Sequence, residues 1–195
     1  RPNNQTRSIV TCLGMGIMLV LTVRLVQMDM IAMLKENKEI DPPNYFFIDI
    51  QSDQTGIFTK TLDLIAPKAE RNLTPLIRSK FYGIDGQLAK NWPYKNKRRE
   101  EWFITRNFVT TINDGESLPK DNLITEGVWW KKEDATTPQV SLEEDAAKRL
   151  GAKIGSQLTM DIQGIKITAP VTSIRKVNWR NMRTNFYMIF SSGAL

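Results

Sequence analysis

Histidine is absent from this sequence of 195 residues, and cysteine occurs once. Without histidine, the serine and cysteine nucleophile mechanisms that depend on an imidazole base are excluded, and metal binding would have to rely on carboxylates. The single cysteine, Cys12, lies inside an apolar stretch, so an intramolecular disulfide and a cysteine-rich metal site are excluded as well. We therefore expect no enzymatic activity, no cofactor and no bound metal.

The signatures of nucleotide and hydrolase chemistry are also missing. The sequence has no GxxxxGK phosphate loop, no GxGxxG after a predicted strand, no HExxH and no GxSxG. The acidic run Glu143–Asp145 has two interpretations, a metal site and the first turn of a helix, where carboxylates interact favourably with the helix dipole. The helix is the favoured interpretation.

Positive charge exceeds negative charge, with a net charge of +6 and a pI near 9.5. The one local concentration of positive charge consists of Lys90, Lys95, Lys97, Arg98 and Arg99. Trp92 and Tyr94 are interleaved with it, and such a mixture can bind a phosphate backbone or lipid headgroups. Pro93 and Asn96 instead indicate a solvated linker, and Glu100–Glu101 follow directly. We therefore expect a linker here and no nucleic-acid partner.

The apolar stretch that begins at Ile9 organises the rest of the chain. Its first fifteen residues, through Val23, carry no charge. As a helix they reach only roughly 22 Å, which is short of a bilayer core of about 30 Å. A span has to extend to Met28, with Arg24 near one interface, where a long basic side chain can reach the headgroups, and Arg7 at the other. We expect a transmembrane helix from Ile9 to Met28 with Arg7 and Arg24 at the membrane interfaces.

Charge and helix continuity predict the topology. Arginines flank the N-terminal end, so the positive-inside rule places that end in the cytoplasm and the residues after about Asp29 outside it. No helix breaker occurs before Pro42, so a stalk is expected from Asp29 to Ile40. Two alternatives remain open. A cleaved signal peptide lacks support from a cleavage pattern, and a buried core helix of a soluble protein would have an uncharged run of similar length.

About 155 residues follow the stalk, enough for one or two modules with their own cores. Tyr45–Ile50 is rich in aromatic and β-branched residues and predicts a strand that is covered on both sides. A short helix comes next, with Ser52 or Asp53 as its cap and an apolar side that runs from Ile57 to Ile65 before the helix stops at Pro67. A returning strand over Leu73–Tyr82 follows it. Together these elements predict a β-α-β unit.

The second half of this region has a mainly β pattern. Its predicted strands are Trp102–Thr111, Ile124–Trp130, Leu158–Ile162, Ile165–Ala169, Val171–Trp179 and Asn185–Phe190. One helix of about nine residues interrupts them, with Ser141 predicted as its N-cap, Glu144 at its third position and Gly151 as its left-handed C-terminal residue. The predicted fold class is therefore α+β.

Four stretches carry a family resemblance when their order and spacing are taken together: Val23–Asp29, Asn44–Gln54, Ile124–Trp130 and Val177–Leu195. They resemble the permease subunits of ABC transporters of the macrolide-exporter, lipoprotein-release and cell-division (MacB/FtsX-like) type. Within that family the YbbP-like branch, with its large periplasmic domain, is the most similar. The resemblance covers essentially the whole chain, although none of the four stretches is a catalytic motif.

The resemblance implies a domain organisation. Residues 1–40 are assigned to the transmembrane span and stalk helix. Residues 41–87 and 184–195 are assigned to a porter-like subdomain built on a β-α-β sheet, and residues 88–183 to an inserted, β-rich, Sabre-like subdomain. Because the chain ends as the second porter half begins, we expect a fragment of a longer permease.

The resemblance also implies a function. A separate cytoplasmic ATPase would hydrolyse ATP, and its motion would pass through the membrane and stalk helices to the periplasmic regions of two permease copies. The YbbP-like branch implies an inner-membrane location, a hydrophobic or lipid-like substrate and a periplasmic esterase as a further partner. Trp129 and Trp130 are candidate substrate contacts, with aromatic packing as the simpler explanation.

Two other functions stay open. A signal-anchored extracytoplasmic binding or sensor domain would share the anchor but would move nothing, and the full reading frame distinguishes it from a permease. A soluble basic protein would bind nucleic acid through residues 90–99, and salt-dependent retention on DNA would reveal it.

Overall fold

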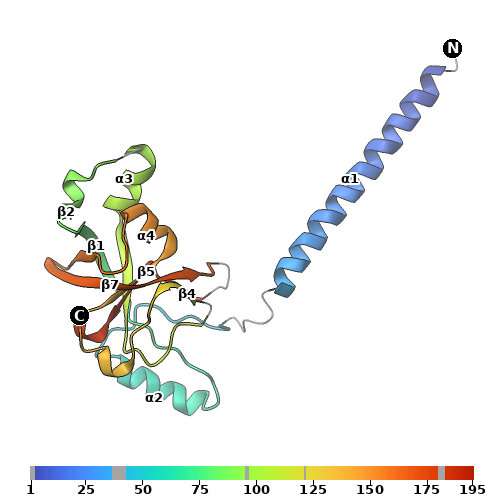
Figure 1. The fold of residues 1–195 in the computed structure, drawn as a ribbon. Helices are drawn as coiled ribbons and strands as arrows, with labels where there is room; N and C mark the ends of the chain where they lie inside the picture. Colours follow the sequence, from blue (N-terminus) through green and yellow to red (C-terminus); the bar gives the residue numbers. More distant parts are fainter. Residues whose placement is uncertain (1–2, 37–42, 95–96, 121, 180–182) are drawn as a thin grey trace. The chain divides into compact units, whose positions relative to one another are not determined.

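The computed structural model describes residues 3–36, 43–94, 97–120, 122–179 and 183–195. The chain divides into two compact units, residues 1–45 and residues 46–195. The first unit contains one long helix, and the second unit, called the body below, is built on a β-sheet (Figure 1). The predicted α+β class is confirmed.

The long helix, α1, runs from Asn3 to Glu36. Its segment Gln5–Ala32 is long and apolar enough to cross a membrane. The prediction that the helix continues past Met28 is confirmed as far as Glu36, whereas residues 37–42, which include the end of the predicted stalk, lie outside the described residues.

The apolar side chains of α1 are not part of a protein core. Leu13, Leu19 and Leu25 are each more than 60% exposed, and no part of the apolar window is buried. This exposure disfavours the alternative of a buried core helix, because such a helix would cover its apolar side chains with protein.

Eight strands of the body form one sheet. They are β1 (Ile77–Ile84), β2 (Gln87–Leu88), β3 (Asn107–Asn113), β4 (Asn122–Gly127), β5 (Val140–Glu143), β6 (Gln157–Ile162), β7 (Ile165–Val177) and β8 (Met188–Ser191). The order is β2-β1-β3-β8-β5-β7-β4, and β6 pairs with both β1 and β7. The pairings β1-β3-β8-β5-β7-β6 therefore close into a ring. The pairs β3–β8 and β5–β7 are parallel and the rest are antiparallel.

The long strand β7 makes this closure possible. Its first part, through Pro170, pairs with β6, and its second part, from Val171, pairs with β5 and β4. The sequence predicts two strands here, and the structure has one continuous strand. The predicted β6–β7 hairpin is confirmed, and Gln163 and Gly164 form its turn with positive φ angles of 54° and 90°.

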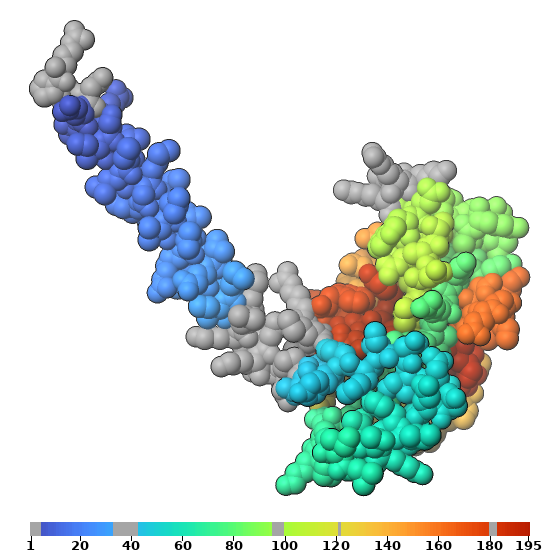
Figure 2. Space-filling view, turned by 180° about the vertical axis from the view of Figure 1, so that it is seen from behind, coloured from blue at the N-terminus to red at the C-terminus, as the bar shows by residue number. Residues whose placement is uncertain are grey.

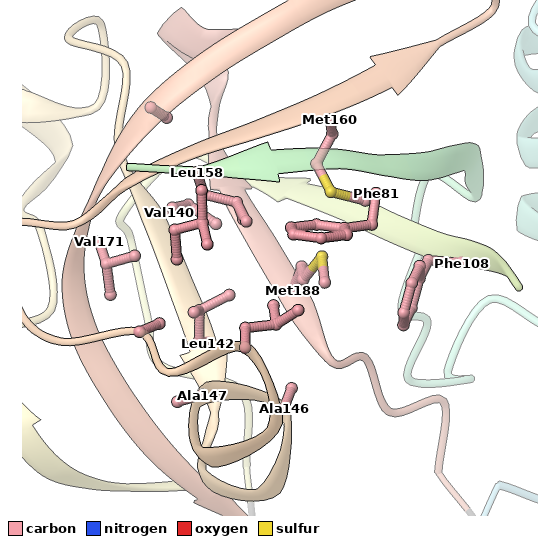
Figure 3. Close-up of a cluster of buried hydrophobic side chains, with 14 of the residues drawn as sticks. Phe81, Phe108, Val140, Leu142, Ala146, Ala147, Leu158, Met160, Val171 and Met188 are labelled. Carbon is pink, nitrogen blue, oxygen red and sulfur yellow. The ribbon is translucent and has the colours of Figure 1, made fainter. Parts of the chain in front are cut away.

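The main core of the body lies between the strands of the ring and α4 (Figure 3). Each strand of the ring contributes a buried side chain, for example Phe81 in β1, Phe108 in β3, Met188 in β8, Leu142 in β5, Val171 in β7 and Leu158 in β6. Helix α4 (Glu144–Leu150) adds Ala146, Ala147 and Leu150. Small residues at two of these positions let the helix approach the sheet closely.

The predicted strand Tyr45–Ile50 is wrong, and with it the predicted β-α-β unit. These residues form no strand, because Asp49 has a φ of 65°, which interrupts an extended backbone. The helix that follows, α2 (Thr55–Ile65), is confirmed, and Phe58 on it makes an edge-to-face contact with Phe47 at 5.1 Å. The division into porter-like and Sabre-like subdomains stays a prediction.

Two further predictions need correction. Trp102–Thr105 belongs to α3 (Lys97–Thr105), and the strand β3 begins only at Asn107. Ser141 lies inside β5, and the N-cap of α4 is Glu143, whose side chain accepts a hydrogen bond from the backbone N–H of Ala146. Pairing of β5 with both β7 and β8 holds Ser141 in extended conformation, so the helix starts later than the capping pattern predicts.

Candidate functional site

Trp129 and Trp130 come one residue after the end of β4 and stack on each other, with ring centroids 4.1 Å apart and 18° between the ring planes. Trp130 is 4% exposed, and its Nε1 donates a hydrogen bond to the backbone oxygen of Asn113 at 3.2 Å. Trp130 shares a small buried cluster with Ala135, Phe186 and Ile189. Trp129 is half-buried against this cluster. Packing therefore explains the position of Trp130. Trp129 is the member of the pair whose ring is partly accessible to a ligand.

Gly127 brings this segment against β7. Its φ is 74°, and a Cβ at this position would lie 2.2 Å from the backbone oxygen of Thr172 and 2.8 Å from Cδ1 of Ile154. The next residue, Val128, donates its backbone N–H to the same oxygen of Thr172 at 3.0 Å. Only glycine combines this backbone conformation with this close approach.

A pocket of about 470 Å³ lies beside the tryptophan pair. Its apolar lining comprises Val128, Trp129, Trp130, Ile154, Pro170 and Val171. Val128 is 75% exposed and Ile154 is 44% exposed, so this apolar surface is accessible from solvent. The volume is within the range of small-molecule sites, and the lining suits an apolar ligand.

The polar part of the lining comprises Lys131, Asp134, Gln139 and Thr172, and Gly127 and Gly155 complete it. The 3₁₀ helix η3 (Lys132–Asp134) positions the first three of these residues, because Asp134 donates its backbone N–H to the Lys131 oxygen at 3.0 Å. Gln139 donates its side-chain amide to the Asp134 backbone oxygen at 2.9 Å. The pocket thus combines an apolar wall with one cation and one carboxylate, an arrangement that suits an amphipathic molecule.

The two predicted interface arginines lie on α1. Arg7 and Arg24 are separated by about 25 Å along a helix, close to the thickness of a bilayer core. Arg24 donates from Nη1 to Oε1 of Gln27 at 3.0 Å, so two polar side chains come together near one end of the apolar segment. Their positions at membrane interfaces stay a prediction.

The predicted basic cluster is only partly described. Lys95 lies outside the described residues, and Lys97 to Arg99 begin helix α3 where a linker was expected. Trp92 is half-buried and makes an edge-to-face contact with Phe81 at 5.3 Å. Because Trp92 packs against the core of the body, its ring is not available as a stacking platform for bases.

A buried arginine was missed by the sequence analysis. Arg175 in β7 is fully buried, and it donates to Oδ1 of Asn122 at 2.9 Å and to the backbone oxygen of Phe186 at 2.7 Å. Burial lowers the pKa of Arg175 to about 9, and the negative charge of Glu143 acts in the opposite direction. Arg175 links β4, β7 and the segment before β8. Its position in an alternating strand carries no signal that distinguishes it from an exposed arginine.

No family model matches this chain. An uncharacterized ABC transporter permease, YbbP of Escherichia coli (strain K12), is 29% identical over 192 residues. The match covers 97% of this chain and 22% of that relative, so the chain spans about a fifth of the relative's length. The crystal structure of "a domain of a putative Permease protein from Porphyromonas gingivalis" aligns with a TM-score of 0.34 and 11% identity over 59% of this chain and 44% of that chain.

The predicted resemblance to an ABC transporter permease is confirmed by the similarity to the Escherichia coli protein. Together with the candidate membrane span in α1, it points to a membrane protein. The finer MacB-like and FtsX-like assignments stay predictions.

Proposed function

We propose that this chain is a non-catalytic segment of an ABC transporter permease, held in the inner membrane by α1, with the residues after about 29 on the periplasmic side. The observation that carries the proposal is the similarity to a permease along 97% of the chain, through α1 and the body alike. Helix α1 supports it, because its apolar segment has the length of a membrane span. The positive-inside rule supplies the orientation.

In this proposal the chain transmits motion and performs no chemistry of its own. A separate cytoplasmic ATPase hydrolyses ATP, and the movement passes through α1 to the body. A second permease copy completes the transporter, and a periplasmic esterase is a further partner. The long uninterrupted helix from Asn3 to Glu36 supports such a role, because a continuous helix can move as one rigid element.

The pocket beside Trp129 is the proposed contact site for a hydrophobic or lipid-like substrate. Its apolar wall can take an acyl chain or a ring, and Lys131 and Asp134 can interact with a polar group at one end. Trp130 anchors the wall, and Trp129 makes the contact.

The apolar surface of residues 46–76 supports a place in a larger assembly. Eight of its large apolar side chains are each more than half exposed: Phe46, Phe47, Ile48, Ile57, Leu64, Ile65, Leu73 and Leu76. Figure 2 shows this segment (cyan to blue-green) spread over one face of the body. Because monomeric proteins rarely expose patches of this kind, we assign the face to contacts with other parts of the transporter. We also propose that it belongs to a porter-like subdomain of residues 41–87 and 184–195, with residues 88–183 inserted.

A signal-anchored binding or sensor domain is the second candidate. The same pocket and the same candidate anchor favour it, since both functions need a ligand site held at a membrane. The two differ in coupling, because ligand binding to a sensor needs no ATPase.

The experiment uses the full-length permease, reconstituted with its ATPase in liposomes that contain a fluorescent phospholipid. We expect ATP-dependent removal of the phospholipid, which Trp129→Ala slows about tenfold if the contact contributes about 1.4 kcal/mol. Leu123→Ala is the matched control, since Leu123 is exposed on β4 outside the pocket. Equal rates with and without ATP would favour the sensor.

A further inference from the structure

An aromatic cluster beside α3 holds two arginines that the proposed function does not use. The cluster consists of Trp102, Phe103, Arg106, Phe108, Arg149, Trp179 and Tyr187, and is called the arginine-aromatic cluster below. Arg106 lies at its centre. Its Cζ is 4.7 Å from the ring centroid of Trp102, 5.1 Å from that of Tyr187 and 5.2 Å from that of Phe108.

The second arginine joins the cluster through Phe103. Cζ of Arg149 lies 5.3 Å from the Phe103 ring centroid, and the Phe103 ring is 5.6 Å from that of Tyr187. Trp179 packs on the same Tyr187 at 4.8 Å. Residues from α3, α4 and β3, together with residues that follow β7 and precede β8, thus bring two guanidinium groups onto one aromatic surface.

The outer part of the cluster is exposed. The side chains of Trp102 and Trp179 are 62% and 46% exposed, which is unusual for the largest apolar side chain. Within the described part of the chain, no carboxylate forms an ion pair with Arg106 or Arg149. A ring occupies only the flat face of a guanidinium, so the N–H donors in its plane remain available to an anion.

We propose that the arginine-aromatic cluster binds the headgroups of anionic phospholipids at a membrane surface. Phosphate groups would accept hydrogen bonds from Arg106 and Arg149, and the exposed indoles would lie at the headgroup level, where tryptophan is enriched in membrane proteins. Charge complementarity favours an anionic surface, because no carboxylate among the described residues forms an ion pair with either arginine. The inference rests on the proposed anchoring by α1, which keeps a bilayer at high effective concentration near the body.

The test places the whole chain in nanodiscs made of phosphatidylcholine alone or with about one third phosphatidylglycerol, using brominated phosphatidylcholine as a quencher of tryptophan emission. The signal of the cluster is the difference in quenched tryptophan emission between the wild-type chain and the variant with Trp102→Phe and Trp179→Phe. We expect this difference to be at least about twofold larger with phosphatidylglycerol. Because the contact is electrostatic, high salt should reduce it to the level seen with phosphatidylcholine.

Arg106→Gln and, separately, Arg149→Gln should each lower the quenching with phosphatidylglycerol. Arg78→Gln is the matched control, since Arg78 is exposed on β1 and pairs with Val109, on the opposite face of the sheet from Phe108, and should change nothing. Arg149 is exposed, so its variant tests the inference even if Arg106→Gln unfolds, which circular dichroism would reveal.

Three outcomes would overturn the inference. One is equal quenching in the two lipid mixtures while the chain stays in the nanodiscs. In that case the proposed anchor stands and only this inference falls. Another is a chain that fails to stay in the nanodiscs, in which case the proposed anchor and this inference both fall. The third is a response to soluble polyglutamate in phosphatidylcholine nanodiscs as large as that to phosphatidylglycerol, which would assign the cluster to an acidic protein.

Discussion

Trp129 lies flat against Trp130, 4.1 Å from centroid to centroid, yet only Trp130 is fully buried and hydrogen-bonded through its indole to Asn113. Both rings line the pocket, but the inner ring belongs to the core and the outer ring is only packed against it. This difference separates a structural role from a binding role in two adjacent residues of the same type.

The first prediction concerns stability. Trp130→Ala should destabilise the body by about 3–5 kcal/mol, because it removes a fully buried indole and leaves a cavity. Trp129→Ala should cost clearly less, since its ring is only half-buried. Equilibrium urea unfolding of the chain in micelles measures both values. Equal losses would mean that the outer ring is as much a part of the core as the inner one.

The second prediction concerns binding. Trp129→Ala should weaken the affinity of an apolar fluorescent probe such as N-phenyl-1-naphthylamine by about tenfold, which corresponds to about 1.4 kcal/mol. A fluorescence titration of the chain in micelles, corrected for probe in empty micelles, gives the dissociation constant. Leu123→Ala should leave it unchanged. A probe that binds both variants with the same affinity would exclude Trp129 from the site.

The third prediction compares two glycines with similar backbone conformation. Gly86 has a φ of 83° with open space around it. Gly86→Ala should therefore lower the free energy of unfolding only by the cost of alanine in a left-handed backbone conformation, about 1–2 kcal/mol. Gly127→Ala should cost about 1–3 kcal/mol more, because its Cβ would collide with the backbone of β7. Thermal or urea unfolding tests the difference. If the two variants are equally stable, the close approach at Gly127 is relieved without cost.

The fourth prediction concerns Glu143 and Arg175, which are direct partners in the parallel register of β5 and β7 and are both buried. Glu143→Gln keeps an acceptor for the Ala146 N–H but removes the charge that counteracts the burial of Arg175. It should destabilise the wild-type chain more than the Arg175→Met chain, with a coupling of about 1–3 kcal/mol in a double-mutant cycle.

The matched control for this cycle is Glu144→Gln. The Glu144 carboxylate is paired with Lys148 at the surface, where ion pairs contribute little, so its effect should be the same in both backgrounds. Additive effects of Glu143→Gln and Arg175→Met would show that the two buried charges do not interact.

Local patterns predicted the elements that depend on local chemistry. The turn at Gln163–Gly164 and the left-handed Gly151 after α4 were predicted because positive φ angles favour a small set of residues. The strand expected at Tyr45–Ile50 failed because Asp49 has a positive φ and these residues have no partner strand in the described part of the body. The same residue composition occurs in a paired strand and in an exposed apolar segment, so composition does not distinguish the two.

Side chains that meet through the fold could not be predicted. Trp102 was assigned to a strand, whereas helix α3 brings it over Arg106 at a helical spacing of four residues. Tyr187 reaches the same cluster because β3 and β8 are neighbours, and Trp179 joins it by packing on Tyr187. Only Trp129 and Trp130 were predicted, as candidate substrate contacts, because the other lining residues of the pocket, including Ile154 and Pro170, come from distant positions.

The most direct test of the membrane-anchored arrangement uses the scarcity of cysteine. In a Cys12→Ser chain expressed in a Gram-negative host, Glu133→Cys places a single thiol on the exposed part of the body, and Gln5→Cys places one at the N-terminal end of α1. Spheroplasts are treated with a membrane-impermeant maleimide before and after lysis. The proposed topology predicts labelling at position 133 in intact spheroplasts and at position 5 only after lysis. Labelling at position 133 only after lysis would place the body inside the cell and contradict the permease assignment.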